Sequence, residues 1–339
     1  MKKPALNVTL AGSPKLALSA MFSMGLLIAA SSHAQSSVTI YGIIDAGVSR
    51  ANNGTTALLS RGMADTWVVK QGNGSRLGFR GYEDMGGGLY ARFQLEHRFT
   101  TDTGAPNNAN VFWLGRSVVA VGSNSLGEIY GGREFSPAFW VALEADPTYW
   151  SYVSQLGQPY TYANYTPVPA TVEASAWRWS NAVGYKSPSL GGLTVELQGA
   201  AGENLRKTNR AGNIMYKSGP VWLGAAFDRL DSKTNLTLIG GGYDFGVARP
   251  TFSYAQAKGG LNGDAKSFSL GLKVPVSYGR VLLMAGRYMP ASHLNSTMFG
   301  ATTEYDLSKR TLLYASLASA KQDSKTRSTA IDFGIKHTF

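Results

Sequence analysis

The stretch Ile331-Asp332-Phe333-Gly334-Ile335-Lys336-His337-Thr338-Phe339, at the end of the chain, alternates between two kinds of side chain. Large apolar or aromatic side chains, with one histidine among them, hold the odd positions, and small or polar side chains hold the even ones. Because side chains of a β-strand point to opposite faces with period two, this strand has one apolar and one polar face. Such a strand suits a barrel wall that separates lipid from water.

The same alternation recurs earlier in the chain, most clearly in Val38–Ser49, Ser75–Tyr82 and Gly88–Phe99. Extended along the sequence, the pattern predicts about sixteen strands. Their starts lie near Val38, Thr66, Gly88, Val111, Leu126, Ala176, Gly192, Asn209, Val221, Leu236, Arg249, Asp264, Tyr278, Ser296, Arg310 and Ser328. An even number lets a single chain close into an antiparallel barrel, and sixteen strands leave an aqueous channel. We therefore expect an all-β fold, a transmembrane antiparallel β-barrel.

Short turns and long polar connections alternate between the predicted strands, which is the usual asymmetry of outer-membrane barrels. One connection, 134–175, differs from the others: it has no clean alternation and contains five prolines and many aromatic residues. A connection of that length is uncommon unless it has a function, and its aromatic side chains need burial. We expect it to fold into the barrel and narrow the channel, as a constriction loop.

The first 34 residues have the three parts of a secretory signal peptide. Lys2 and Lys3 are followed by the nearly uncharged run Leu16–Ala30 and by Ser32-His33-Ala34, which offers small residues for cleavage. A membrane anchor is the alternative, but the run is short and broken for a span of about 20 residues. We predict a signal peptide at 1–34 and a single barrel domain at 35–339.

The charge and the absence of cysteine limit the possible functions. The chain holds 32 Lys and Arg against 21 Asp and Glu, and loss of 1–34, with three lysines and no acid, leaves a formal charge of +8. The basic residues are spread at alternate strand positions, which fits a basic channel lining better than a nucleic-acid site. Without cysteine there are no disulfides, thiol chemistry or Cys-based metal sites. We expect no cofactor, no metal and no nucleic-acid partner.

Several segments resemble the general porins of Gram-negative bacteria, particularly their betaproteobacterial branch. The resemblance rests on Ser37–Gly47, Gly74–Leu89, Phe93–Glu96, Gly131–Glu134 and Gly334–Phe339, which include both ends of the mature chain. It implies a sixteen-stranded barrel in the outer membrane, usually a homotrimer. It also implies a third loop in the lumen, with basic side chains on the wall and acidic ones on the loop.

The resemblance also implies roles for individual residues. The basic wall of the constriction would consist of Arg76, Arg133 and Arg178, with Arg80, Arg92 and Arg116 as secondary wall charges. Glu144 and Asp146 are the predicted loop acids, although the usual acidic spacing of the family is not reproduced. Phe339 is expected to be the last lipid-facing aromatic residue of the terminal strand. It also resembles the C-terminal aromatic residue by which the barrel-assembly machinery recognises outer-membrane barrels. Trp177 and Trp179 are expected to face lipid at the interface, with sugar stacking as the alternative.

These observations favour a general porin, a passive channel for small hydrophilic solutes and inorganic ions with weak anion selectivity. A substrate-specific channel for a sugar or organic anion is the alternative, because five loop tyrosines, Tyr149, Tyr152, Tyr160, Tyr162 and Tyr165, offer a dedicated route. A barrel enzyme is disfavoured, since the three histidines after residue 34 have no serine and carboxylate at suggestive positions. An adhesin with a closed lumen is also disfavoured, because it would need a plug or a narrow barrel and the sequence shows neither. We expect the chain to form a homotrimer, to contact outer-membrane lipids and to be recognised by the barrel-assembly machinery.

Overall fold

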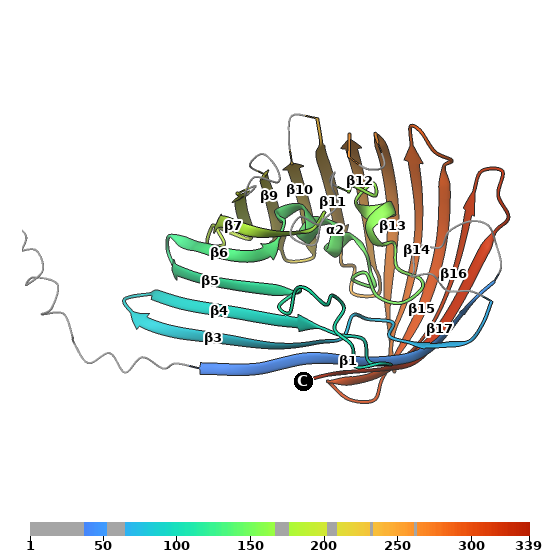
Figure 1. Ribbon diagram of the computed structural model, residues 1–339, viewed down its shortest axis with the longest axis horizontal. Helices are drawn as coiled ribbons and strands as arrows, with labels where there is room; N and C mark the ends of the chain where they lie inside the picture. The colour runs from blue at the N-terminus through green and yellow to red at the C-terminus, as the bar shows by residue number, and fades with distance from the viewer. Residues whose placement is uncertain (1–36, 53–64, 167–175, 202–208, 231–232, 261–262) are drawn as a thin grey trace, which may run out of the picture.

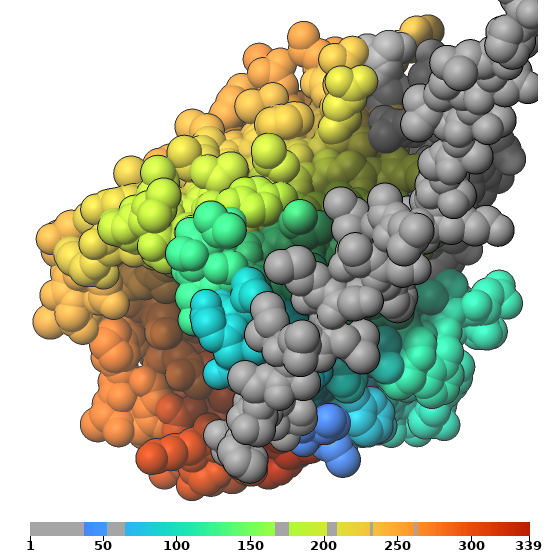
Figure 2. Space-filling model, turned by 90° about the vertical axis from the view of Figure 1, so that its left-hand side faces the viewer, coloured from blue at the N-terminus to red at the C-terminus, as the bar shows by residue number. Residues whose placement is uncertain are grey.

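The computed structural model describes residues 37–52, 65–166, 176–201, 209–230, 233–260 and 263–339, and these form one closed antiparallel sheet (Figure 1). The barrel closes because β1 (Ser37–Ala51) pairs on one edge with β17 (Ser328–Thr338) and on the other with β3 (Arg76–Gly86). Figure 2 shows this seam from the side, with the red C-terminal residues beside the blue N-terminal ones. The predicted signal peptide and residues 167–175 of the predicted loop lie outside the described ranges.

Sixteen strands make the wall, and each pairs with the next along the chain. The remaining strands are β4 (Leu89–Arg98), β5 (Arg116–Ser123), β6 (Gly127–Phe135), β7 (Arg178–Lys186), β8 (Leu193–Ala200), β9 (Asn209–Ser218), β10 (Val221–Arg229), β11 (Asn235–Tyr243), β12 (Arg249–Lys258), β13 (Ala265–Val276), β14 (Gly279–Pro290), β15 (Ser296–Asp306) and β16 (Thr311–Gln322). The short β2 (Val68–Lys70) lies along the same edge of β1 as β3 and lengthens that strand. This confirms the predicted barrel, although individual starts shift: the fourth strand of the wall, β5, begins at Arg116 instead of Val111.

The alternation of the terminal strand separates the two surfaces of the wall. In β17, Ile331, Phe333 and Ile335 are 42%, 47% and 44% exposed on the outer face, while Asp332 between them is 2% exposed. Large apolar side chains at the outward positions of the other strands are exposed in the same way, for example Val119, Val183 and Leu270. The outer surface is therefore an apolar band that suits contact with lipid tails.

Residues 136–166 run through the interior of the barrel and contain two short helices (Figure 1). The helix α2 (Pro137–Ala145) starts with a proline, whose fixed φ suits the first helical turn, and its apolar side packs on strands β8 to β13. The helix α3 (Gly157–Thr161) packs on β12, β13 and β14. Within the described ranges, neither helix is long and apolar enough to span a membrane.

Glycines on the inner wall leave room for this segment. A Cβ atom added at Gly286 of β14 would lie 2.6 Å from the Cβ of Tyr160, and one at Gly300 of β15 would lie 2.5 Å from the carbonyl oxygen of Ser154. Ordinary carbon contacts need about 3.5–4.0 Å, so a larger residue would push the segment away from the wall. Here glycine in a strand marks the close approach of another stretch of backbone.

Hydrogen bonds fix the segment to strands on the far side of the barrel. The Tyr162 hydroxyl donates to Asp228 of β10 at 2.6 Å, and the backbone N–H of Val153 donates to Asp332 of β17 at 3.0 Å. Both carboxylates are on the inner face and almost fully buried. The segment therefore crosses the lumen and is held at separate points.

Candidate pore constriction

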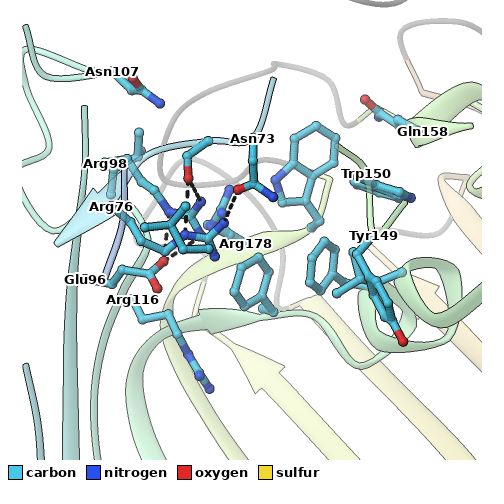
Figure 3. A pocket seen from close by; sticks show the side chains of 18 of the residues that line it. Asn73, Arg76, Glu96, Arg98, Asn107, Arg116, Tyr149, Trp150, Gln158 and Arg178 are labelled. Carbon is cyan, nitrogen blue, oxygen red and sulfur yellow. Dashed lines mark hydrogen bonds and ion pairs between the residues drawn. The ribbon is translucent and has the colours of Figure 1, made fainter. Parts of the chain in front are cut away.

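A cavity of about 740 Å³ lies between the inner segment and the wall formed by β3, β4, β5 and β7 (Figure 3). Its wall side carries four arginines and one carboxylate: Arg76, Arg98, Arg116, Arg178 and Glu96. The formal charge of these lining residues is therefore +3. Charges fixed beside the water of a channel can select passing ions by sign.

Strand register creates the first half of the arginine cluster. Arg76 and Arg98 are direct partners on β3 and β4, so two like charges face one another on the inner wall. Such pairs are unfavourable unless a neighbour compensates. Glu96 does so by pairing with Arg98 at 2.6 Å, while Asn73 accepts a hydrogen bond from Arg76 at 2.8 Å. One carboxylate between two guanidinium groups leaves excess positive charge.

The other two arginines are held by buried groups next to the loop. Arg116 forms an ion pair with the fully buried Glu134, and its Nη1 donates to Gln94 at 2.6 Å. The Nε of Arg178 donates to the carbonyl of Gly115 at 3.1 Å, and the guanidinium carbon lies 4.3 Å from the ring centroid of Phe135. This cation–π contact fixes the guanidinium group at the cavity wall.

Aromatic rings, not acids, form much of the loop side of the cavity (Figure 3). Phe139 of α2 stacks on Phe135 with centroids 4.1 Å apart, and Trp150 meets Trp177 edge to face at 5.5 Å. Tyr149 and Trp150 have positive φ values, 51° and 56°, in the left-handed region that non-glycine residues rarely adopt. The turn that places these two rings is therefore a strained part of the loop.

The two predicted loop acids do not line this cavity. Asp146 is fully buried, and its carboxylate accepts hydrogen bonds from the backbone N–H groups of Thr148, Leu156 and Gly157. Burial raises the pKa of Asp146, although these hydrogen bonds act in the opposite direction. The prediction that Asp146 faces the pore is thus wrong: its side chain holds the loop backbone together. Periodicity gives no direction for side chains in an irregular loop.

Glu144 lies at the end of α2 and points to another part of the wall. Its carboxylate pairs with Lys217 of β9 at 2.9 Å and Arg249 of β12 at 2.8 Å. Partial burial raises the pKa of Glu144, but the hydrogen bonds from Arg249 and Lys217 outweigh it and hold the pKa below its usual range. Glu144 is thus a loop acid opposite basic wall residues, outside the cavity that holds Arg76 and Arg178.

The predicted arginines divide into two groups. Arg76, Arg116 and Arg178 line the cavity, whereas Arg80, Arg92 and Arg133 do not. Arg133 is buried and donates to the carbonyl of Leu114 at 3.1 Å and to Ser180 at 2.9 Å. A register irregularity between Gly132 and Glu134 brings Glu134 to Arg116. The sequence gives no sign of this irregularity, which explains the misplacement of Arg133 at the constriction.

The two secondary charges outside the cavity are also on the inner wall. Arg92 forms an ion pair with Glu128, to which both its Nε and its Nη2 donate hydrogen bonds. Arg80 lies four residues beyond Arg76 on β3, with its guanidinium carbon 5.6 Å from the ring centroid of Tyr41. Sequence reasoning missed Arg98 and Glu96 as members of the cluster, although both share the polar alternate face of β4 with Arg92.

The expectation that Trp177 and Trp179 face lipid is wrong. Trp179 is completely buried against the loop, in a cluster that includes Val141 of α2, and Trp177 lines the arginine cavity. Both rings point inward because the wall next to the loop has an apolar partner on its inner face. Arg178 lies between them in sequence, and its side chain also turns to the cavity, at the first residue of β7.

Comparison with known proteins agrees with this geometry. The model of a family described as Gram-negative porin matches residues 17–325, which is most of the chain. The chain belongs to the Gram-negative porin family. It is therefore an outer-membrane β-barrel channel, and the family and fold are those of channels and not of enzymes.

Relatives of this porin are outer-membrane porins of betaproteobacteria. It is 29% identical to outer membrane porin protein 32 of Delftia acidovorans, over 90% of this chain and 95% of that protein. It is 26% identical to an outer membrane porin protein of Bordetella pertussis, over 92% of this chain and 96% of that protein. Among solved structures, the anion-selective porin from Comamonas acidovorans matches with a TM-score of 0.75 and 26% identity, covering 90% of this chain and 100% of the other.

Proposed function

We propose that this porin passes small hydrophilic solutes and inorganic ions by passive diffusion and weakly prefers anions. The observation that carries the proposal is the arginine cluster, four guanidinium groups and one carboxylate around the cavity between the loop and the wall. Fixed charge at a narrow point of a channel selects ions by sign. The anion-selective porin from Comamonas acidovorans supports the same preference. We further propose that residues 134–175 constrict the pore and that the channel has no catalytic role.

The reversal potential in a KCl gradient across a planar bilayer tests the preference. We expect a chloride-to-potassium permeability ratio above one, and a lower ratio for Arg76→Gln. A unit charge about 6 Å from an ion in water contributes roughly 0.7 kcal/mol, or about threefold in permeability. A preference for potassium in the wild-type channel would overturn the proposal.

Arg80→Gln is the matched control for that experiment. Arg80 lies on the same strand and the same inner face as Arg76, but it is not among the residues that line the cavity. Four strand residues separate the two positions by about 13 Å, which exceeds a Debye length of about 10 Å at 0.1 M salt. The Arg80 variant should therefore keep the wild-type permeability ratio. Equal losses in both variants would show that net charge, and not the cluster, sets selectivity.

A channel dedicated to an organic anion is the second candidate, because guanidinium groups and aromatic rings share one cavity. A planar carboxylate would find both an ion-pair partner and ring faces there. Benzoate and acetate distinguish the two candidates. Saturable block of chloride current by benzoate, but not by acetate at the same concentration, would favour the dedicated channel. Equal, unsaturated permeation would favour the general porin.

We also propose that the mature porin starts near Gln35, after removal of residues 1–34, and assembles as a homotrimer. Phe339 would act as its assembly signal. At the seam of the barrel, the backbone of Phe339 exchanges two hydrogen bonds with Gly42 of β1, at 3.0 and 3.1 Å. A terminal aromatic residue that also completes the seam is well placed to be recognised by the assembly machinery.

A further inference from the structure

Residues 71–75, between β2 and β3, bend over the inner face of the wall and meet the inner segment. The backbone N–H of Tyr152 donates to the carbonyl of Gly72 at 2.7 Å. The side-chain amide of Asn73 donates to the hydroxyl of Ser151 at 2.6 Å. A Cβ atom added at Gly72 would lie 2.9 Å from the ring of Tyr152, so the two stretches are in close contact. We call 71–75 the wall bend.

Buried groups near the barrel seam hold the wall bend in place. The backbone N–H of Gly72 donates to Asp45 of β1 at 2.7 Å, and the hydroxyl of Tyr314 on β16 donates to the same carboxylate oxygen at 2.9 Å. The backbone N–H of Asp45 donates in turn to the hydroxyl of Ser75 at 3.1 Å. Asp45 and Ser75 are completely buried. The wall bend is therefore fixed to the barrel by hydrogen bonds that water does not reach.

The loop tip, 149–152, is the strained part of the inner segment. Three of its four residues, Tyr149, Trp150 and Tyr152, have φ values of 51°, 56° and 67° in the left-handed region. Such residues keep this conformation only where the surrounding structure holds them. The fourth, Ser151, is buried and bonded to the wall bend. Contacts with the wall bend are thus among those that keep the loop tip in place.

The side chain of Asn73 bonds Arg76 as well as the loop tip. Its carbonyl oxygen accepts from Nη2 of Arg76 at 2.8 Å (Figure 3), and the Nε of Arg76 donates to the carbonyl of Gly74 in the wall bend at 3.2 Å. Because a guanidinium group only donates, the amide oxygen of Asn73 must face Arg76 and its NH₂ group must face Ser151. One amide therefore links a charge of the cavity to the loop tip.

Arg76 depends on such acceptors for a fixed direction. Its direct cross-strand partner is Arg98, and like charges in that position repel. The carboxylate of Glu96 is bonded to Arg98, with 2.8 Å between its Oε1 and the Nε of Arg98. Asn73 and the carbonyl of Gly74 are neutral acceptors, so they hold the guanidinium group of Arg76 without cancelling its charge. An arginine side chain has several rotatable bonds and loses its direction when such a partner is removed.

We propose that Asn73 is a positioning residue that joins Arg76 to the loop tip, so that the anion preference of the channel depends on the position of the loop. The inference rests on the anion preference proposed above. While the loop tip lies on the wall bend, the amide of Asn73 is fixed at both ends and Arg76 is held at the cavity. When the tip leaves, the amide loses Ser151 and is free to turn, and Arg76 loses its acceptor. The channel therefore selects ions less well in its loop-open state, through Arg76 as well as through its width.

Replacement of Asn73 by leucine tests the proposal in planar bilayers with the purified porin. Leucine is of similar size and has neither a donor nor an acceptor in its side chain. We expect the chloride-to-potassium permeability ratio to fall about 1.5- to 2-fold, as for one unit charge that moves from about 6 to about 10 Å from the ion in water. Asn107→Leu is the matched control, because Asn107 lines the same cavity but is exposed. It should keep the wild-type ratio.

The Arg76→Gln background separates this role from a merely structural one. Asn73→Leu should lower the ratio when Arg76 is present and leave it unchanged in Arg76→Gln, because no charge remains for Asn73 to hold. An equal fall in both backgrounds would overturn the proposal, since Asn73 would then act through the width of the pore. An unchanged ratio in Asn73→Leu with Arg76 present would overturn it as well.

Ser151→Ala tests the joint from the side of the loop, and it decides the matter should Asn73→Leu fail to fold. Loss of one neutral hydrogen bond should make transitions between conductance levels about 2- to 12-fold more frequent. The ratio can then be measured at each level. The loop-open level should have the lower ratio, and adding Arg76→Gln should shrink the difference between levels. An unchanged transition frequency, or a difference of the same size in both backgrounds, would overturn the coupling.

The coupling and the anion preference fail separately. A wild-type permeability ratio below one would overturn the anion preference. The coupling is measured as a change in ratio between channels with and without Arg76, so that change decides it whatever the wild-type ratio is.

Discussion

Replacement of Asp146 by asparagine should release the inner loop from its closed conformation. The carboxylate of Asp146 accepts four hydrogen bonds, two from Thr148 at 2.9 and 2.7 Å, one from Leu156 at 2.7 Å and one from Gly157 at 3.1 Å. All four partners are donors. An asparagine has one oxygen and one NH₂ group, so its NH₂ must face either the Thr148 pair or the two backbone N–H groups of Leu156 and Gly157.

The cost follows from the number of donors left without an acceptor. Two buried donors at about 1–3 kcal/mol each give about 2–6 kcal/mol. At about 4 kcal/mol the open loop would be populated roughly a thousandfold more often, since about 1.4 kcal/mol corresponds to a factor of ten. The barrel itself should remain closed, because its strand pairing does not involve this side chain.

Single-channel recording in planar bilayers measures the effect. The Asp146→Asn channel should show frequent transitions between conductance levels where the wild-type channel is quiet. Asp102→Asn is the matched control, because it removes the same carboxylate from an exposed loop position. If the Asp146 variant opens and closes no more often than the control, the carboxylate does not hold the loop, and the role assigned to its hydrogen bonds is refuted.

Three further outcomes are expected. Gly286→Ala should shift the loop by about 1 Å through contact with Tyr160 and change the conductance, whereas Gly131→Ala, where the nearest atom to an added Cβ lies 3.9 Å away, serves as a control for added volume. The pKa of Glu144 is lower in the folded protein than its ordinary value of 4.5, so its ion pairs are complete above that pH and are lost as the pH falls through the lowered pKa. Conductance should therefore stay constant from about pH 8 to about 5 and change in more acidic buffer; a step of the same size in Glu144→Gln would assign it to other groups. Deletion of Phe339 should lower the amount of folded, heat-modifiable porin in the outer membrane, and a normal amount would remove its role as an assembly signal.

The predicted strands agree with the structure because one physical constraint acts on every residue of the wall. Each outward side chain of the band contacts lipid and each inward one contacts water or the loop, so period two recurs in the strands of the wall from β1 to β17. Arg76, Arg116 and Arg178, which the resemblance to porins predicts as wall charges, lie on strands of the wall and line the cavity.

The remaining site predictions failed where that periodicity stops. The register irregularity at Gly132 and Glu134 displaced Arg133 from the cavity, and loop packing turned Trp179 inward. Asp146 and Glu144 lie where no repeating geometry relates sequence position to side-chain direction. Hydrogen bonds and ion pairs with other parts of the chain decide those directions.

Local alternation in the chain was enough to establish the barrel, the approximate number of its strands and the basic character of its inner wall. A single strand such as Ile331–Phe339 already expresses this alternation, because each residue responds to lipid or water on its own side of the wall. Two features needed the folded structure: which charges meet at the cavity between the loop and the wall, and that aromatic rings face them. Those arrangements depend on register and barrel closure, which bring residues far apart in the chain into contact, and no local pattern contains that information.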